Sequence, residues 1–147
     1  MKKLMGLDIG DKNIGIAVSD GLGITAQALT TLKRKNINVD IASLKVIIEK
    51  YDVGEIIIGF PKNMDGSIGH QAKKVIHFTE QLKKSLNIPI IFWDERLTTV
   101  MATKVMIEGD LSRKKRKKRI DKIAAQLILQ NYLDRKKFFS KSEENEK

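Results

Sequence analysis

The chain of 147 residues has no cysteine, only two prolines and few aromatic side chains, which make up 5% of the sequence. Without cysteine it can form neither a disulfide nor a thiolate metal site. No apolar run approaches the roughly 20 residues of a membrane span, and the N-terminus lacks the apolar region and cleavage site of a signal peptide. We therefore expect a cytoplasmic protein that does not associate with a membrane.

The absence of cysteine also limits how a metal could be bound. Ligands must be oxygen atoms or the two histidines, His70 and His77. The histidines stand seven residues apart, with no acidic residue between them at ligand spacing. We expect neither to bind metal, so an oxygen site for a hard cation such as Mg²⁺ or Mn²⁺ is the remaining possibility.

Negative charge is scarce, because 28 lysines and arginines face 18 acidic residues, which gives a net charge of +10. Such an excess favours phosphate-bearing partners. The cations are concentrated in seven consecutive residues: Arg113, Lys114, Lys115, Arg116, Lys117, Lys118 and Arg119. Because these like charges repel, we interpret this basic block as a flexible arm that becomes ordered on a nucleic-acid backbone. A nuclear-localisation segment is the less economical alternative.

Hydrophobic periodicity predicts an α/β domain with a five-stranded mixed sheet. Strands are expected at residues 3–9, 14–19 and within 26–32 as an antiparallel meander, and at 55–60 and 88–93 as parallel strands joined through helices. Helices are expected over about 39–51, from an N-cap at Ser67 to about Leu86, and over about 97–107 and 120–136. We expect one domain over residues 1–138 and a polar, disordered tail over 139–147.

Three acidic side chains stand at the edges of these apolar elements. Asp8 ends the first strand, Glu95 follows the fifth, and Asp121 shares the core-facing side of the last helix with Ala124 and Ala125. A carboxylate at the edge of a core is costly unless a charge satisfies it. Parallel strands end on the same side of a sheet, which brings Asp8 and Glu95 towards one site. Simpler interpretations remain open. Asp8 could lie at a strand end that faces solvent, and Glu95 and Asp121 could be acids that complement helix dipoles.

Three such carboxylates would repel one another. At about 4 Å and an effective dielectric near 20, each pair costs on the order of 4 kcal/mol. The cluster therefore needs either a proton or a divalent cation. With a nucleic-acid partner, the economical use is phosphodiester hydrolysis with two ions roughly 3.5–4 Å apart. Asp94, beside Glu95, is either a further ligand or a residue that holds the turn.

Three further residues are candidates for contacts with nucleic acid. Lys12 lies in the expected hairpin loop, Asn63 in the turn after the fourth strand, and Arg96 directly after the acidic pair. That turn is expected on the same rim of the sheet as Asp8 and Glu95. An ordinary turn for Asn63 and an ion pair for Arg96 are equally simple interpretations.

Several motifs, in order, resemble those of the YqgF/RuvX family of Holliday junction resolvases over about residues 4–136. They are GLDIG at 6–10 with IGIAVSD at 14–20, GFP at 59–61 with NMDG at 63–66, DERLTT at 94–99 with Ala102, and the segments around Asp121 and Tyr132. Phe60 stands where an aliphatic residue is more usual. The resemblance implies a ribonuclease H-like fold and a cytoplasmic bacterial nuclease that matures the precursor of the small-subunit ribosomal RNA. It also implies that Asp8, Glu95 and Asp121 are the catalytic acids.

The leading hypothesis is a metal-dependent endonuclease acting on structured RNA, as a monomer or a weak homodimer. A resolvase of four-way DNA junctions is the nearest alternative, and its two symmetric cuts require a dimer. A nucleic-acid-binding module without hydrolytic activity is a second. An actin-like nucleotide-binding protein is the weakest, because the chain has no room for the second lobe that such proteins close on a nucleotide.

Overall fold

The computed structural model describes the backbone of residues 2–63, 65–97 and 113–146, and the side chains of residues 2–63, 65–96 and 121–137. Its five-stranded sheet has the order β3-β2-β1-β4-β5. Strands β1, β2 and β3 are antiparallel neighbours, whereas β4 runs parallel to β1 and β5 parallel to β4. The predicted mixed sheet is confirmed. The bounds are β1 (Lys3–Ile9), β2 (Asn13–Ser19), β3 (Ala26–Lys33), β4 (Val53–Phe60) and β5 (Ile90–Asp94).

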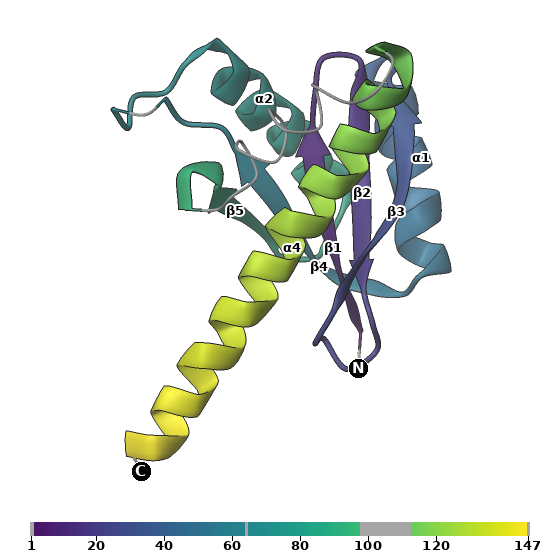
Figure 1. Ribbon diagram of the computed structural model, residues 1–147. Helices are drawn as coiled ribbons and strands as arrows, with labels where there is room; N and C mark the ends of the chain where they lie inside the picture. Colours follow the sequence, from purple (N-terminus) through teal and green to yellow (C-terminus); the bar gives the residue numbers. More distant parts are fainter. Residues whose placement is uncertain (1, 64, 98–112, 147) are drawn as a thin grey trace.

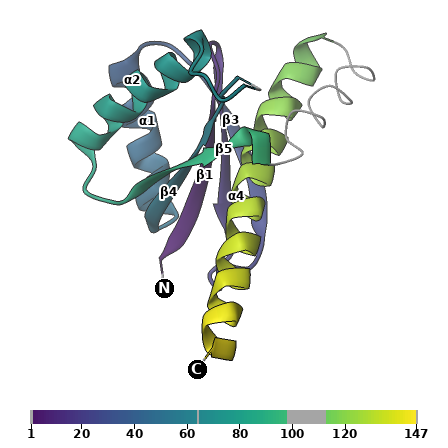
Figure 2. The same cartoon turned by 90° about the vertical axis from the view of Figure 1, so that its left-hand side faces the viewer.

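Helices cover both faces of this sheet. Figure 2 shows α1 (Ile37–Lys50) and α2 (His70–Ser85) on one face and α4 (Arg113–Glu146) on the other. A short 3₁₀ helix, η1 (Glu95–Leu97), follows β5 directly. The helix predicted over 97–107 lies, apart from Leu97, outside the described residues. No helix in the described part of the chain is long and apolar enough to cross a membrane.

Helix α4 is longer than the predicted span of residues 120–136. It begins with the basic block at Arg113 and continues to Glu146, through the segment predicted to be a disordered tail. No glycine or proline follows Gly109, and the charged residues of both ends have high helix propensity. The prediction used only apolar periodicity, which ends before the helix does. The division of the chain at residue 138 stays a prediction.

The start of α2 also differs from the prediction. Its N-cap is Gly69, which makes no side-chain capping bond, and not Ser67. The hydroxyl of Ser67 instead donates to the Asp65 carboxylate at 2.6 Å, and the Ser67 amide donates to the same oxygen at 2.9 Å. Ser67 therefore stabilises the preceding turn and not the helix.

Side-chain alternation along the strands divides the core into two layers. Met5 and Leu7 of β1 belong to the layer beneath α1 and α2, where Leu44 and Phe78 are also buried. The opposite layer packs Ile57 and neighbouring side chains against the apolar side of α4, which consists of Ala124, Ala125, Ile128, Leu129 and Leu133. This alternation decides on which side of the sheet the polar residues of β1 lie.

Candidate active site

Asp8 lies near the carboxyl end of β1, on the side of the sheet that α4 covers. Gly6, two residues earlier on the same side, lies against Ala125 and Leu129 of α4. Asp8 pairs with Gly15 of β2 and is only 6% exposed. A strand that ends in solvent would leave its carboxylate in water, so the burial of Asp8 argues against that simpler interpretation.

Glu95 approaches Asp8 from above β4, the strand that neighbours β1 on the side away from β2. It is the first residue of η1 and is 4% exposed. Its Oε1 lies 2.7 Å from the position that a Cβ on Gly59 would occupy. Leu7 pairs with Ile58, so Gly59 stands beside Asp8 in the adjacent strand. The missing side chain of Gly59 therefore makes room for the Glu95 carboxylate over β4.

Asp121 comes from α4 and lies over β2. A Cβ on Gly15 would overlap the backbone carbonyl of Asp121, so the helix contacts the strand directly at this residue. Because Gly15 is the β-sheet partner of Asp8, α4 brings Asp121 next to the end of β1. Ala124 and Ala125, predicted to share the core-facing side of this helix with Asp121, are both buried.

The three acidic residues line one cavity of about 250 Å³. The structure thus brings together, from β1, η1 and α4, the residues that the sequence predicts as a cluster. Figure 1 shows α4 crossing in front of β1 and β2. Among the described residues, no group of three or more acidic or histidine side chains already has the arrangement of a metal site. Their catalytic role stays a prediction. The other lining residues are Ile9, Gly10, Asp11, Gly59, Pro61 and Gln71.

Gln71 is a cavity residue that sequence reasoning missed. It belongs to α2, and its Nε2 donates a hydrogen bond to the Ile9 carbonyl at 3.1 Å. This bond fixes the backbone directly after Asp8. A glutamine in an amphipathic helix carries no signal that separates it from an ordinary surface residue, so the sequence alone could not have indicated it.

Asp94 is engaged by Arg96. The Arg96 Nη2 lies 2.8 Å from Asp94 Oδ2, its Nε lies 3.2 Å from both carboxylate oxygens, and its backbone amide donates to Oδ1 at 2.9 Å. The Arg96 side chain lowers the pKa of Asp94, so this carboxylate is ionised. Asp94 does not line the cavity. These contacts favour the interpretation in which Asp94 holds the turn that presents Glu95.

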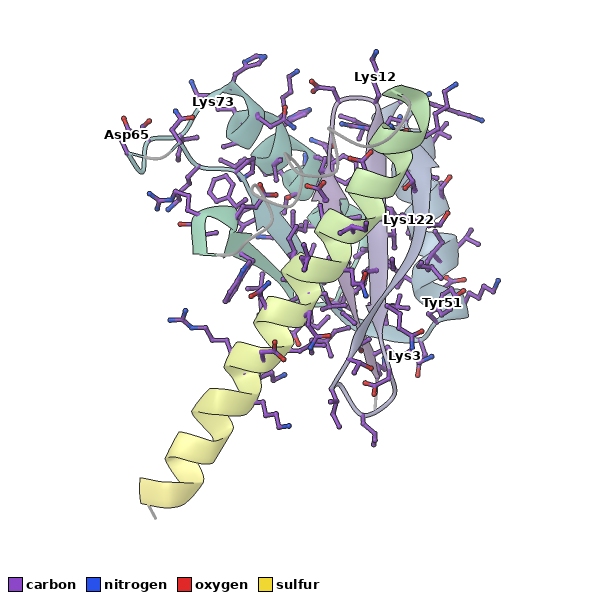
Figure 3. The ribbon with its side chains drawn as sticks, in the orientation of Figure 1. Lys3, Lys12, Tyr51, Asp65, Lys73 and Lys122 are labelled. Carbon is purple, nitrogen blue, oxygen red and sulfur yellow. The ribbon has the colours of Figure 1, made fainter. Side chains whose placement is uncertain are left out.

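The residues proposed for nucleic-acid binding come from several elements, and those with described side chains do not line the cavity. Lys12 is exposed at the tip of the β1–β2 hairpin, which Figure 3 shows at the end of the molecule where α4 begins. Asn63 is exposed after β4, and its Nδ2 donates to Ser67 Oγ at 3.0 Å. The basic block, residues 113–119, forms the first turns of α4, and its side chains lie outside the described part. The roles of these residues stay predictions.

Comparison with known proteins gives a consistent family. The family model described as "RuvX: Holliday junction resolvase" matches residues 2–135. A protein of Clostridium acetobutylicum is 56% identical over 132 residues, which cover 90% of this chain and 98% of that protein. One of Thermoanaerobacter pseudethanolicus is 58% identical over 136 residues, which cover 92% and 98%. Both carry the name "Putative pre-16S rRNA nuclease".

Two solved structures share the fold at low sequence identity. Thermus thermophilus RuvC in complex with a Holliday junction substrate has a TM-score of 0.56 and 12% identity, covering 90% of this chain and 94% of that one. Fowlpox virus resolvase in complex with Holliday junction DNA has a TM-score of 0.54 and 16% identity, covering 90% and 97%. The predicted ribonuclease H-like fold is confirmed. With the sequence match over residues 2–135, the chain belongs to the RuvX family.

Proposed function

We propose that this protein is a metal-dependent endonuclease that hydrolyses phosphodiester bonds of structured nucleic acid. Its substrate is the precursor of the small-subunit ribosomal RNA, cut in the maturation of the 5′ end, and it works in the cytoplasm as a monomer or weak homodimer. The observation that carries the proposal is the convergence of Asp8, Glu95 and Asp121 on one cavity at the ends of parallel strands. The names of the relatives support the substrate.

The donor set suits a hard divalent cation. Asp8, Glu95 and Asp121 offer only carboxylate oxygens, which are the ligands that Mg²⁺ and Mn²⁺ prefer. Asp8 and Glu95 are almost completely buried and line the same cavity, so a bound cation would offset the repulsion between their negative charges. When bound, such a cation supplies an activated water at neutral pH and stabilises the charge on the leaving oxygen.

Residues of the cavity and of the turn beside it position these acids. Gln71 fixes the backbone after Asp8, and Gly59 leaves the space that Glu95 occupies. The Asp94–Arg96 pair holds the turn that carries Glu95. Carboxylates that are held in place before the substrate arrives need little reorganisation during the reaction, which favours catalysis.

Lys12 and the basic block bind the phosphate backbone of the substrate next to the cut. They supply a contact that does not depend on base sequence, as phosphate contacts do in general. The substrate is therefore recognised mainly by its shape and charge. Asn63 and Arg96 lie on the same rim and add polar contacts.

A cleavage assay tests the proposal. Purified protein is incubated with ribosomal RNA precursor and with a four-way DNA junction, in Mn²⁺ and in chelator. We expect the RNA to be cut only with metal, and Asp8→Asn and Asp121→Asn to abolish cleavage while their circular dichroism spectra stay unchanged. Glu80→Gln, an exposed residue of α2 outside the cavity, is the control and keeps full activity. Full activity of either asparagine variant refutes the assignment.

The second candidate is cleavage of four-way DNA junctions. It is favoured by the shared fold with two resolvases whose structures contain Holliday junctions. The two symmetric cuts of that reaction need a dimer. Symmetric junction cleavage by a dimer, with the RNA left intact, would select this function. Tight RNA binding with no metal-dependent product from any substrate would instead indicate a module without hydrolytic activity.

A further inference from the structure

A second, larger cavity lies on the opposite face of the sheet, between the start of α1 and the exposed side of α2. Its volume is about 670 Å³, which is in the usual range of ligand sites. Arg34, Lys35, His70, Lys73, Lys74 and His77 supply its basic lining. The last four share one side of α2, because they are spaced by three, four and seven residues. The proposed hydrolysis uses none of these six residues.

This cavity has an excess of positive charge. Four of its lining side chains are lysine or arginine, and two, Asp11 and Asp40, are acidic. Arg34 pairs with the buried Asp40 at 3.3 Å, and Lys74 pairs with Asp11 at 2.9 Å. Lys35 and Lys73 are exposed and have no ion-pair partner among the described residues. Two cations are therefore available to an anionic ligand.

The two cavities share a wall. Asp11, at the β1–β2 hairpin, lines both of them. Gly10 lines the active-site cavity, and its carbonyl accepts a hydrogen bond at 3.0 Å from Arg34 Nη1 of the second cavity. Figure 3 shows Lys12 of this hairpin and Lys73 of α2 at the same end of the molecule. A nucleic-acid strand that leaves the active-site cavity over the hairpin would therefore reach Lys35 and Lys73.

We propose that the second cavity binds phosphate groups of the nucleic-acid strand that the active site cuts, some nucleotides away from the cut. The identity of that strand rests on the proposed function, whereas the phosphate chemistry rests on the cavity itself. Phosphodiester groups are anionic and evenly spaced along a strand, so one strand can occupy both cavities. Arg34 and Lys74 are held by their acidic partners and shape the site, while Lys35 and Lys73 contact the phosphates.

The histidines give a direct measurement. The chain has only two, His70 and His77, and both line this cavity. Their imidazole Hε1 proton signals therefore report on the cavity alone. Single-stranded RNA is titrated into the protein in chelator, so that no cutting occurs, and its affinity is followed in parallel by fluorescence anisotropy. We expect both histidine signals to move and to saturate together with the anisotropy.

Two matched double variants locate the effect. In Lys35→Gln with Lys73→Gln, we expect the histidine shifts to vanish and the slope of log affinity against log salt to fall by about 1.4, which is two contacts to a single strand. The control, Lys45→Gln with Lys84→Gln, removes the same charge from α1 and α2 outside the cavity and should keep the histidine shifts. Histidine signals that stay fixed at saturating RNA, or an unchanged slope in the first double variant, overturn the proposal.

Titrations with inorganic phosphate and with adenosine monophosphate separate the sources of the phosphate. If inorganic phosphate and adenosine monophosphate both bind more weakly than RNA, the result supports a nucleic-acid strand as the occupant of the cavity. If inorganic phosphate or adenosine monophosphate saturates the histidine shifts at a lower concentration than RNA does, the cavity binds a free phosphate ligand. That result overturns the proposal that it binds the strand. The readout needs no hydrolysis, so histidine shifts without any cleavage would leave the cavity proposal standing and refute only the nuclease. Cleavage with histidine signals that stay fixed at saturating RNA would refute the cavity proposal and leave the nuclease standing.

Discussion

At the scale of single residues, the candidate active site depends on two glycines, which have no side chain. Gly15 and Gly59 flank Asp8 in the two neighbouring strands. The first lets the backbone of α4 approach at Asp121, and the second makes room for the Glu95 carboxylate. A row of glycine, aspartate and glycine across three strands thus lets two further acids reach one carboxylate in the sheet.

This row predicts the effect of Gly59→Ala. The new methyl group would stand 2.7 Å from Glu95 Oε1 and would overlap the side chain of Ile128. We expect Glu95 to be displaced, metal-dependent cleavage to be lost, and stability to fall by about 1–3 kcal/mol, the usual cost of overpacking. Cleavage assays and urea unfolding measure the two effects.

Gly21→Ala is the matched control for that variant, because a Cβ on Gly21 would meet nothing within 4 Å. It should leave both cleavage and unfolding nearly unchanged. Wild-type cleavage by Gly59→Ala would show that the position of Glu95 does not matter for the reaction.

At the scale of elements, periodicity in the sequence was sufficient for the sheet and for most helices. The strands were predictable because alternating or continuous apolar runs are what a half-buried or buried strand requires. The ends of α4 could not be predicted, because its charged terminal residues form a helix without contributing to the apolar pattern. The N-cap of α2 could not be predicted either, because Ser67 has a competing hydrogen-bond partner, Asp65, within its own turn.

The same distinction separates the two cavities. Asp8 and Glu95 could be placed from strand direction alone, since Asp8 lies near the end of β1, Glu95 directly follows β5, and both strands run parallel to β4. The Arg34–Asp40 pair depends on the conformation of the β3–α1 connection, and the bond from Gln71 to the Ile9 carbonyl joins α2 to β1, so no sequence pattern indicates either contact. The second cavity was therefore not predicted, although its two histidines had been noticed.

Another contact between elements concerns Gln130 of α4. Its Oε1 accepts from the buried Ala26 amide at 2.8 Å, and its Nε2 donates to the Ile24 carbonyl at 3.0 Å, which ties α4 to the start of β3. Gln130→Ala leaves that amide without its partner, so we expect a loss of about 1–3 kcal/mol in urea unfolding and faster hydrogen exchange at Ala26.

Gln130→Glu is the matched control, because a carboxylate keeps the acceptor while it removes the donor. It should preserve most of the protection of the Ala26 amide. Equal exchange rates in the wild type and in Gln130→Ala would show that the glutamine contributes nothing to the attachment of β3.

At the scale of the whole molecule, charge is distributed unevenly. The net charge is +10, and the basic block occupies the end of α4 nearest the β1–β2 hairpin, while the other end of α4 extends beyond the sheet (Figure 1). Helix α4 therefore begins, with the basic block, at the end of the molecule that holds the hairpin shared by both cavities. A polyanion would be attracted to this end first.

This distribution predicts how salt affects binding. We expect the slope of log affinity for single-stranded RNA against log salt to fall by about 2.8 when four lysines of the block are replaced by glutamine, because each phosphate contact contributes about 0.7. Fluorescence anisotropy in chelator over a range of salt measures it. The four replaced residues are Lys114, Lys115, Lys117 and Lys118.

A second quadruple variant removes the same charge elsewhere, from Lys45, Lys50, Lys83 and Lys84 of α1 and α2. It should change the slope far less. Equal slopes in the two quadruple variants would mean that net charge alone, and not the basic block, determines binding.

The central claim is that three acids from separate elements hold a divalent cation together. Calorimetric titration of Mn²⁺ into the protein, without nucleic acid, tests it most directly. We expect saturable binding in the wild type and at least a roughly tenfold weaker affinity, about 1.4 kcal/mol, in each of Asp8→Asn, Glu95→Gln and Asp121→Asn. Wild-type affinity in any of these three variants would contradict it.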